Sequence, residues 1–234
     1  EHGTQEIVTR WASGQIERTT WAGIHRDARK MAQALLRLGM RKGDRIATLA
    51  MNHAHHLASW YGSAGMGGVL HTVNPRLFDD QLVYICNHAA DRVLMFDRQF
   101  LPIVDRLRPQ LTSIEHFILF DSAGEGDYLG FREWIDAEDG AFSWIEVDER
   151  DPCGLCYTSG TTGNPKGVLY LHRTNVIHAL AELQPDVFDF SARSVVMPVV
   201  PMFHANAWGL AYSAAAVGAR MVFSATNDAA ALWK

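Results

Sequence analysis

The interpretation of this chain begins with the stretch Tyr157-Thr158-Ser159-Gly160-Thr161-Thr162-Gly163-Asn164-Pro165-Lys166-Gly167-Val168. One apolar run, 154–157, leads into it and another, 168–171, leads out, so we expect a strand, a loop and a strand. Four hydroxyl side chains lie within five residues of this loop, and its three glycines allow positive φ and leave backbone N–H groups uncovered. Together with the ammonium group of Lys166, these donors are suited to binding a polyphosphate.

Three other kinds of loop are less consistent with this stretch. An ordinary Ser/Thr/Gly hairpin does not require four hydroxyls, three glycines and a lysine together. A Walker A loop requires Ser or Thr directly after its lysine, whereas Gly167 follows Lys166. A dinucleotide-binding loop begins with G-x-G, which Gly160 and Gly163 do not provide. The sequence therefore predicts a phosphate-binding loop of another type.

Upstream of the loop, helix and strand patterns alternate along the chain. Apolar residues at 24, 28, 31, 35 and 38 share one face of a helix predicted over 21–38, with Thr20 as its N-cap and Gly39 as its stop. Further helices are predicted over 55–66, 78–87 and 99–107, and strands over 45–51, 69–73, 92–96, 117–120 and 219–224. This alternation predicts an α/β fold in which parallel-rich sheets are covered by helices, a layered αβα arrangement.

An acidic segment over 137–151 separates this alternating region from the phosphate loop. We interpret it as a solvated connector that marks a boundary between two parts of the chain. The predicted division is an N-terminal α/β subdomain over 1–150 and a second segment over 151–234 that contains the loop.

The composition excludes several classes of protein. The 234 residues are 48% hydrophobic and 20% charged, which is globular rather than disordered. A net charge of −5 argues against nucleic-acid binding. The most apolar long stretch, 205–217, contains Asn206 and is too short for a membrane span, so we expect a cytoplasmic protein without an integral membrane segment. Because the chain begins with Glu1 rather than methionine, we also expect residues to be missing before it.

The cysteines and clustered histidines do not predict a metal site. Cys153 and Cys156 form a C-x-x-C pair, but a zinc site usually needs two such pairs, and both cysteines fit a buried strand. The cluster His53, His55 and His56 has no acidic residue or cysteine near it in sequence, so we interpret it as a solvated helix start.

A second informative block is Val196-Met197-Pro198-Val199-Val200-Pro201-Met202-Phe203-His204-Ala205-Asn206-Ala207-Trp208-Gly209. The phosphate loop closely resembles the signature of the acyl-adenylate-forming (AMP-binding) enzymes, and this block follows at the spacing those enzymes use. Its Pro-Met-Phe-His core with Asn206 and Trp208 looks most like the fatty-acyl-CoA ligase branch, and the enzymes for medium or long fatty acids and for methylthio-propionate are the most similar. Softer similarity extends over nearly the whole chain and includes the turn Asn74-Pro75-Arg76-Leu77.

The resemblance implies a ligase that acts in two steps. The carboxylate of a fatty or other small acid attacks the α-phosphate of ATP, which gives an acyl-adenylate and pyrophosphate, and coenzyme A then displaces AMP to form a thioester. Carried over to this sequence, the phosphate-binding residues are Thr158, Ser159, Gly160, Thr161, Thr162, Gly163 and Lys166. Thr158 is the first choice for contact with Mg²⁺, and Thr161 the second.

The second block supplies the residues expected at the acyl group. The resemblance implies that His204 orients the carboxylate near the α-phosphate or lines the acyl entrance, with Ala205 as an adjacent pocket residue and Trp208 as a gate or wall of the acyl tunnel. The alternatives are a hydrogen-bonded core histidine for His204 and core packing for Trp208. Trp208 would lie one turn beyond His204 if the segment were helical.

The family pattern extends beyond this sequence. The adenine- and ribose-binding residues, the hinge and the C-terminal domain with its lysine are all expected after residue 234, so we expect an N-terminal part of the large domain that is inactive alone. Two alternatives to an acyl-CoA ligase remain open: an adenylating relative that does not form a CoA thioester, and a non-catalytic nucleotide-binding module. Homodimers occur in the family, so a homodimer is a further expectation.

Overall fold

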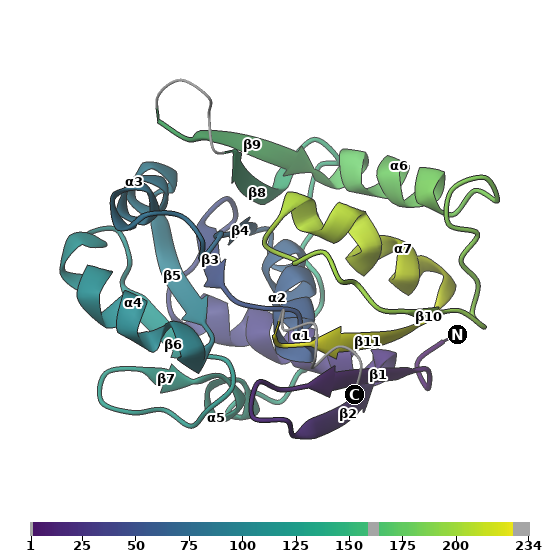
Figure 1. Cartoon of the computed structure of the whole chain (residues 1–234), viewed down its shortest axis with the longest axis horizontal. Coiled ribbons are helices and arrows are strands. Elements are labelled where there is room, and N and C mark those ends of the chain that lie inside the picture. The colour runs from purple at the N-terminus through teal and green to yellow at the C-terminus, as the bar shows by residue number, and fades with distance from the viewer. Residues whose placement is uncertain (1, 159–163, 227–234) are drawn as a thin grey trace.

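The computed structural model describes residues 2–158 and 164–226, which form two β-sheets and the helices between and around them (Figure 1). The larger sheet has the strand order β7-β6-β5-β3-β4-β8-β9. Its strands, in chain order, are β3 (Arg45–Leu49), β4 (Val69–Thr72), β5 (Asp91–Phe96), β6 (His116–Leu119), β7 (Leu129–Gly130), β8 (Pro152–Thr158) and β9 (Lys166–Leu171). Every neighbouring pair is parallel except β8 and β9, which are antiparallel.

The smaller sheet joins the beginning of the chain to the end of its described part. It has the order β10-β11-β1-β2, from β1 (Glu6–Arg10), β2 (Ile16–Thr20), β10 (Val195–Val196) and β11 (Arg220–Ser224). β1 pairs parallel with β11, with Ile7 opposite Met221, and antiparallel with β2. The two pairings give β1 a partner on each side, and Ile7 is fully buried there.

Two helices lie between the sheets and build the main core. They are α1 (Trp21–Arg37) and α2 (Ala54–Gly65), which pack on each other. The predicted capping of α1 is confirmed, because Thr20 accepts a hydrogen bond from the backbone N–H of Gly23. Buried side chains of both helices join one cluster with Ile46 of the larger sheet and Phe223 of the smaller one.

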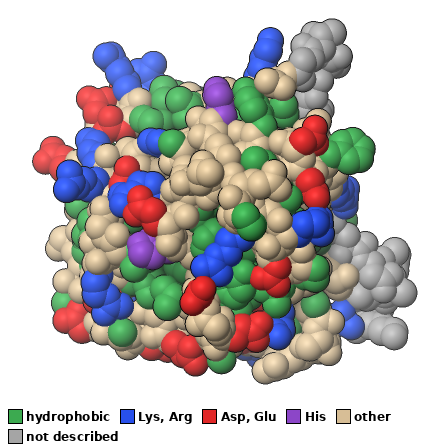
Figure 2. Space-filling model, turned by 90° about the vertical axis from the view of Figure 1, so that its left-hand side faces the viewer, with side chains coloured by type: hydrophobic (Ala, Val, Ile, Leu, Met, Phe, Trp, Pro, Cys, Tyr) green, Lys and Arg blue, Asp and Glu red, His purple; other side chains and the backbone are tan. Residues whose placement is uncertain are grey.

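The opposite face of the larger sheet is covered by α3 (Asp79–Ala89) and α4 (Leu101–Leu107), which bury a second apolar cluster against β3, β5 and β6. Figure 2 shows this side of the molecule, on which basic and acidic side chains are intermingled. The ion pairs of the described residues include Arg106 of α4 with Asp79 of α3, and Arg98 with Glu125. The remaining helices are α5 (Phe131–Asp136), α6 (His172–Glu182) and α7 (Leu210–Val217), with short 3₁₀ turns at η1 (Arg98–Phe100), η2 (Arg108–Gln110) and η3 (Ala205–Gly209).

The predicted fold class is confirmed, because helices and largely parallel strands alternate and stack in layers. The structure adds to the expected αβα arrangement a second sheet on the far side of α1 and α2. The boundary predicted near residue 150 stays a prediction, although β8 pairs with β4 and β11 pairs with β1, so strands from both segments enter both sheets. In the described residues, no helix has both the length and the apolar character needed to cross a membrane.

Candidate functional site

β8 and β9 form a hairpin at the top of the view in Figure 1, and the described ends of the predicted phosphate loop lie at its tip. The registered pairs of the hairpin end with Thr158 opposite Lys166. The five predicted loop residues between them lie outside the described residues: Ser159, Gly160, Thr161, Thr162 and Gly163. The two strands expected from the sequence are therefore antiparallel partners, and Thr158 and Lys166 are the described phosphate-binding candidates at their facing ends.

Thr158 and Lys166 both have exposed side chains at this tip. The Thr158 hydroxyl donates a hydrogen bond to the carbonyl oxygen of Lys166 over 3.4 Å. Because its hydrogen is used in this way, the hydroxyl oxygen keeps its lone pairs, which suit it to a hard cation. The Lys166 ammonium is suited to an anion such as a phosphate.

A cavity of about 220 Å³ adjoins the hairpin and brings together residues from both informative sequence blocks. Thr158 from the first block and His204 and Ala205 from the second lie in its wall. The other lining residues, which the sequence did not single out for this site, are Asn74, Leu77, Cys156, Tyr157, Val168 and Tyr170. Of these, Asn74 and Leu77 belong to a turn that resembles the family. This resemblance is the sequence feature from which their place in the site could have been predicted. Tyr157 and Tyr170 lie on the two strands of the hairpin, β8 and β9.

The segment after His204 is not an α-helical turn. The expected placement of Trp208 one such turn beyond His204 is therefore wrong. Residues 205–208 all have positive φ, between 45° and 57°, and form what we call the left-handed turn. Such a conformation costs non-glycine residues about 1–2 kcal/mol each, so neighbouring contacts must stabilise it. The core-packing alternative for Trp208 is also wrong, because this side chain is 55% exposed. His204 is exposed as well, so it is not a core histidine.

Contacts hold the left-handed turn from both sides. On one side Asn206 is buried, and its amide oxygen accepts a hydrogen bond from the Thr72 hydroxyl at the end of β4, over 3.4 Å. On the other side His178 of α6 lies 2.9 Å from the carbonyl oxygen of Trp208, through its Nε2 atom. The same nitrogen lies 3.2 Å from a carboxylate oxygen of Glu182, a buried residue whose pKa is raised by burial.

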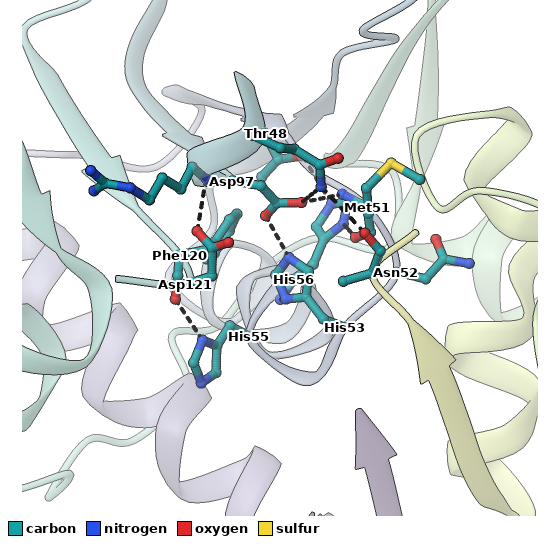
Figure 3. Close-up of polar contacts among 12 residues, drawn as sticks. Thr48, Met51, Asn52, His53, His55, His56, Asp97, Phe120 and Asp121 are labelled. Carbon is teal, nitrogen blue, oxygen red and sulfur yellow. Dashed lines mark hydrogen bonds and ion pairs between the residues drawn. The ribbon is translucent and has the colours of Figure 1, made fainter. Parts of the chain in front are cut away.

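The histidine cluster at the start of α2, whose polar contacts are drawn in Figure 3, is buried, so the solvated helix start expected from the sequence is wrong. His53 is the N-cap of α2, and its Nδ1 accepts a hydrogen bond from the backbone N–H of His56. Its Nε2 therefore carries the hydrogen and donates to Asp97 at the end of β5, over 2.9 Å. His55 similarly bonds through Nδ1 to the carbonyl oxygen of Phe120, which follows β6. Burial outweighs the expected solvation because each ring has a polar partner inside the core.

His56 completes this cluster as a neutral ring. Its Nδ1 donates to the carbonyl oxygen of Met51 over 2.9 Å, so its Nε2 accepts from the Thr48 hydroxyl over 3.0 Å. Burial, together with the neighbouring His53, lowers the pKa of His56 to about 3. Burial alone would raise the pKa of Asp97, but His53 and the backbone N–H of Met51 lower it overall. In the described part of the chain, no group of three or more His, Cys, Asp or Glu residues could hold a metal ion.

The two cysteines of the C-x-x-C pair lie on β8, as expected for strand residues. Cys153 is buried and Cys156 is half-buried. Burial raises the pKa of the Cys153 thiol to about 11 and also raises the pKa of Cys156. Both groups are therefore protonated at neutral pH, which makes them poor nucleophiles and poor metal ligands.

Comparison with known proteins identifies the family. The model of a family described as AMP-binding enzyme matches residues 2–234. The chain belongs to the AMP-binding enzyme family. This confirms the resemblance based on the phosphate loop and the second block.

Similar members of the AMP-binding family are named CoA ligases. The chain is 51% identical over 228 residues to a 3-methylmercaptopropionyl-CoA ligase of Ruegeria lacuscaerulensis, and 44% identical over 227 residues to a medium-chain-fatty-acid–CoA ligase of Ectopseudomonas oleovorans. Each match covers 94% of this chain and 42% of the relative. The crystal structure of the N-terminal domain of FACL13 from Mycobacterium tuberculosis superposes with a TM-score of 0.83 at 27% identity, over 98% of this chain and 55% of that one. The chain thus spans less than half the length of these curated relatives.

Proposed function

We propose that the protein containing this chain is an acid–thiol ligase that activates a fatty or other small carboxylic acid with ATP and transfers it to coenzyme A. The observation that carries this proposal is the cavity in which Thr158 of the phosphate-loop hairpin meets His204 and Ala205 of the second block. The family membership supports the same activity, because its similar members are named CoA ligases for methylmercaptopropionate and for fatty acids.

The first step joins the acid to AMP. A carboxylate oxygen attacks the α-phosphorus of ATP, a P–O bond forms, and pyrophosphate leaves. The barrier to this step comes mainly from negative charge that crowds around phosphorus, so positioned donors and cations are the expected means of catalysis. Lys166 and the loop residues 158–163 are proposed to bind the β- and γ-phosphates.

Mg²⁺ fits this arrangement as an ion that arrives with ATP. Mg²⁺ is usually bound by few protein ligands together with substrate phosphates, and the free lone pairs of the Thr158 hydroxyl suit it to be one of them. When bound, the ion would neutralise phosphate charge. Thr161, the second choice, lies outside the described residues.

His204 and Ala205 are proposed to serve the acid. The exposed imidazole of His204 lies in the cavity wall with Thr158, so it can orient a carboxylate that is bound beside the phosphates. Trp208 is exposed and is proposed as the gate or wall of the acyl site. In the second step the sulfur of coenzyme A attacks the acyl carbonyl carbon, and AMP leaves.

The experiment is a substrate panel on the intact protein. The protein is incubated with ATP, Mg²⁺ and one acid at a time (3-methylmercaptopropionate, octanoate or palmitate), with and without coenzyme A. We expect acid-dependent exchange of pyrophosphate into ATP, and an acyl-CoA product by mass spectrometry when coenzyme A is present. Exchange without a thioester would indicate an adenylating relative, and the absence of both would refute the proposal in favour of a nucleotide-binding module.

A further inference from the structure

The left-handed turn at residues 205–208 connects the two side chains on which the proposed acyl site depends, His204 and Trp208. Four consecutive non-glycine residues at positive φ do not keep that conformation without contacts from their surroundings. Inside the turn, the backbone N–H of Ala207 donates to the carbonyl oxygen of His204 over 3.0 Å. One local hydrogen bond does not outweigh the strain of four residues, so contacts from other elements must hold the turn.

α6 supplies such a contact at the end of the turn. The Nε2 atom of His178 lies 2.9 Å from the carbonyl oxygen of Trp208 and 3.2 Å from a carboxylate oxygen of Glu182. Because both neighbours are acceptors, Nε2 carries the hydrogen and donates it. Gly209 lies directly against this pair, since a Cβ atom there would be 2.6 Å from the His178 ring and 3.2 Å from Glu182.

Glu182 explains why the contact is specific. Its side chain is only 5% exposed, and its second carboxylate oxygen is buried without a hydrogen-bond partner among the described residues. Such a group is costly unless it is paired, and His178 is its neighbour one helical turn away. The pair therefore fixes the imidazole with its N–H directed at the turn.

We propose that His178, supported by Glu182, is a latch that holds the left-handed turn and thereby positions His204 and Trp208 for the acyl group. His178 and Glu182 are positioning residues, because neither lines the 220 Å³ cavity. The proposal rests on the proposed function in so far as it concerns the acid. It affects the acid rather than ATP, because Thr158 and Lys166 lie on the β8–β9 hairpin and not on the turn.

The test compares three variants of the intact protein. His178→Ala removes the donor, His178→Gln keeps an N–H near the position of Nε2, and Ile177→Ala changes an exposed neighbour on the same helix as a control. We expect His178→Ala to raise KM for the acid about tenfold, the size of one lost hydrogen bond, while KM for ATP changes less than about twofold. His178→Gln should show only a small part of this rise in KM for the acid. Ile177→Ala should have the same KM values as the wild-type protein.

A second measurement reports on the turn without any activity. Hydrogen exchange of a peptide covering residues 204–210 should be about tenfold faster in His178→Ala than in the unchanged protein or in His178→Gln. Unchanged exchange would overturn the latch, and faster exchange with an unchanged KM for the acid would overturn its positioning role. If His178→Ala raised KM for the acid and for ATP equally and also lowered kcat and thermal stability, the role of His178 would be structural only. That result would also overturn the positioning role. If the intact protein forms no acyl-CoA, the proposed function fails, and hydrogen exchange alone decides on the latch.

Discussion

His56 shows how the core constrains a single side chain. Its ring donates one hydrogen bond to the carbonyl oxygen of Met51 and accepts one from the hydroxyl of Thr48, and only the neutral imidazole can do both. Protonation would place a hydrogen on the accepting nitrogen and a charge in the core. This is why burial, with His53 nearby, lowers its pKa to about 3.

His56 is expected to make the protein sensitive to acid. The unfolded chain takes up this proton near pH 6.5 and the folded chain only near pH 3, so the unfolded state binds more protons between these values. The contribution of His56 to stability is complete above about pH 6.5 and is lost as the pH falls toward 3, by about 1.4 kcal/mol per pH unit. Urea unfolding at pH 7.5, 6, 5 and 4 measures this loss. His56→Gln should reduce the slope, the exposed His25→Gln should not, and equal slopes for all three proteins would contradict the prediction.

Lys166 is expected to contribute to ATP binding. Replacing it with alanine removes the ammonium at the start of β9, and a lost charge-assisted contact with phosphate weakens binding about tenfold. Calorimetric titration of the intact protein with ATP gives the dissociation constant. Lys30→Ala is a matched control, because that lysine pairs with Asp136 on α5. An unchanged dissociation constant in Lys166→Ala would count against a phosphate-binding role.

At the scale of residues, inference from the local sequence grouped side chains that the structure places in one cavity wall, and their roles stay predictions. Thr158, His204 and Ala205 were predicted from two contiguous blocks, and the structure brings them into one cavity wall. It failed for the histidines of α2, because their partners lie far along the chain. Asp97 is 44 residues from His53, and Phe120 is 65 residues from His55. Nothing in the local sequence shows these contacts.

At the scale of elements, the junction between the left-handed turn and α7 is expected to tolerate only glycine. Gly209 has a φ of +81°, and its Cβ would be 2.6 Å from the His178 ring. Gly14 has a similar φ of +87°, but a Cβ there would meet nothing within 4 Å. Gly14→Ala should therefore cost about 1 kcal/mol of unfolding free energy for its backbone alone, and Gly209→Ala distinctly more. Chemical denaturation measures both, and equal costs would contradict the steric argument.

Element prediction depended on how clear the periodicity was. α1 was predicted closely, since its apolar residues repeat on one face and Thr20 caps it. α6 was not predicted, because Val176, Ile177 and Leu180 are apolar but exposed, so the helix has no simple apolar stripe facing the core. The positive φ of residues 205–208 could not be read from the sequence, because Asn206 is the one residue among the four whose type adopts that conformation readily.

At the scale of the whole molecule, the two predicted segments are expected to unfold as one cooperative unit. A chain that ends at residue 150 lacks β8 and β11, so the buried strand β4 and the half-buried strand β1 each lose a paired neighbour. We expect residues 1–150 alone to show no cooperative thermal transition by circular dichroism and to bind an apolar dye. The 234-residue chain is the reference. A cooperative transition in the shorter chain would show that the N-terminal α/β subdomain is independent.

The layered α/β class could be predicted for the whole molecule because it follows from alternating local patterns. The smaller sheet could not. It is formed by short strands from opposite ends of the described chain, and β10 has only two residues. Each of these strands is too short and too mixed in polarity to indicate its partner.

The pairing of β1 with β11 also has a consequence during protein synthesis. Met221, the partner of Ile7, is translated roughly 200 residues after it. At typical elongation rates of about 5–20 residues per second, β1 would wait on the order of 10–40 s for β11. During that interval an apolar edge of β1 is open to wrong partners, so the nascent chain is a natural client for chaperones.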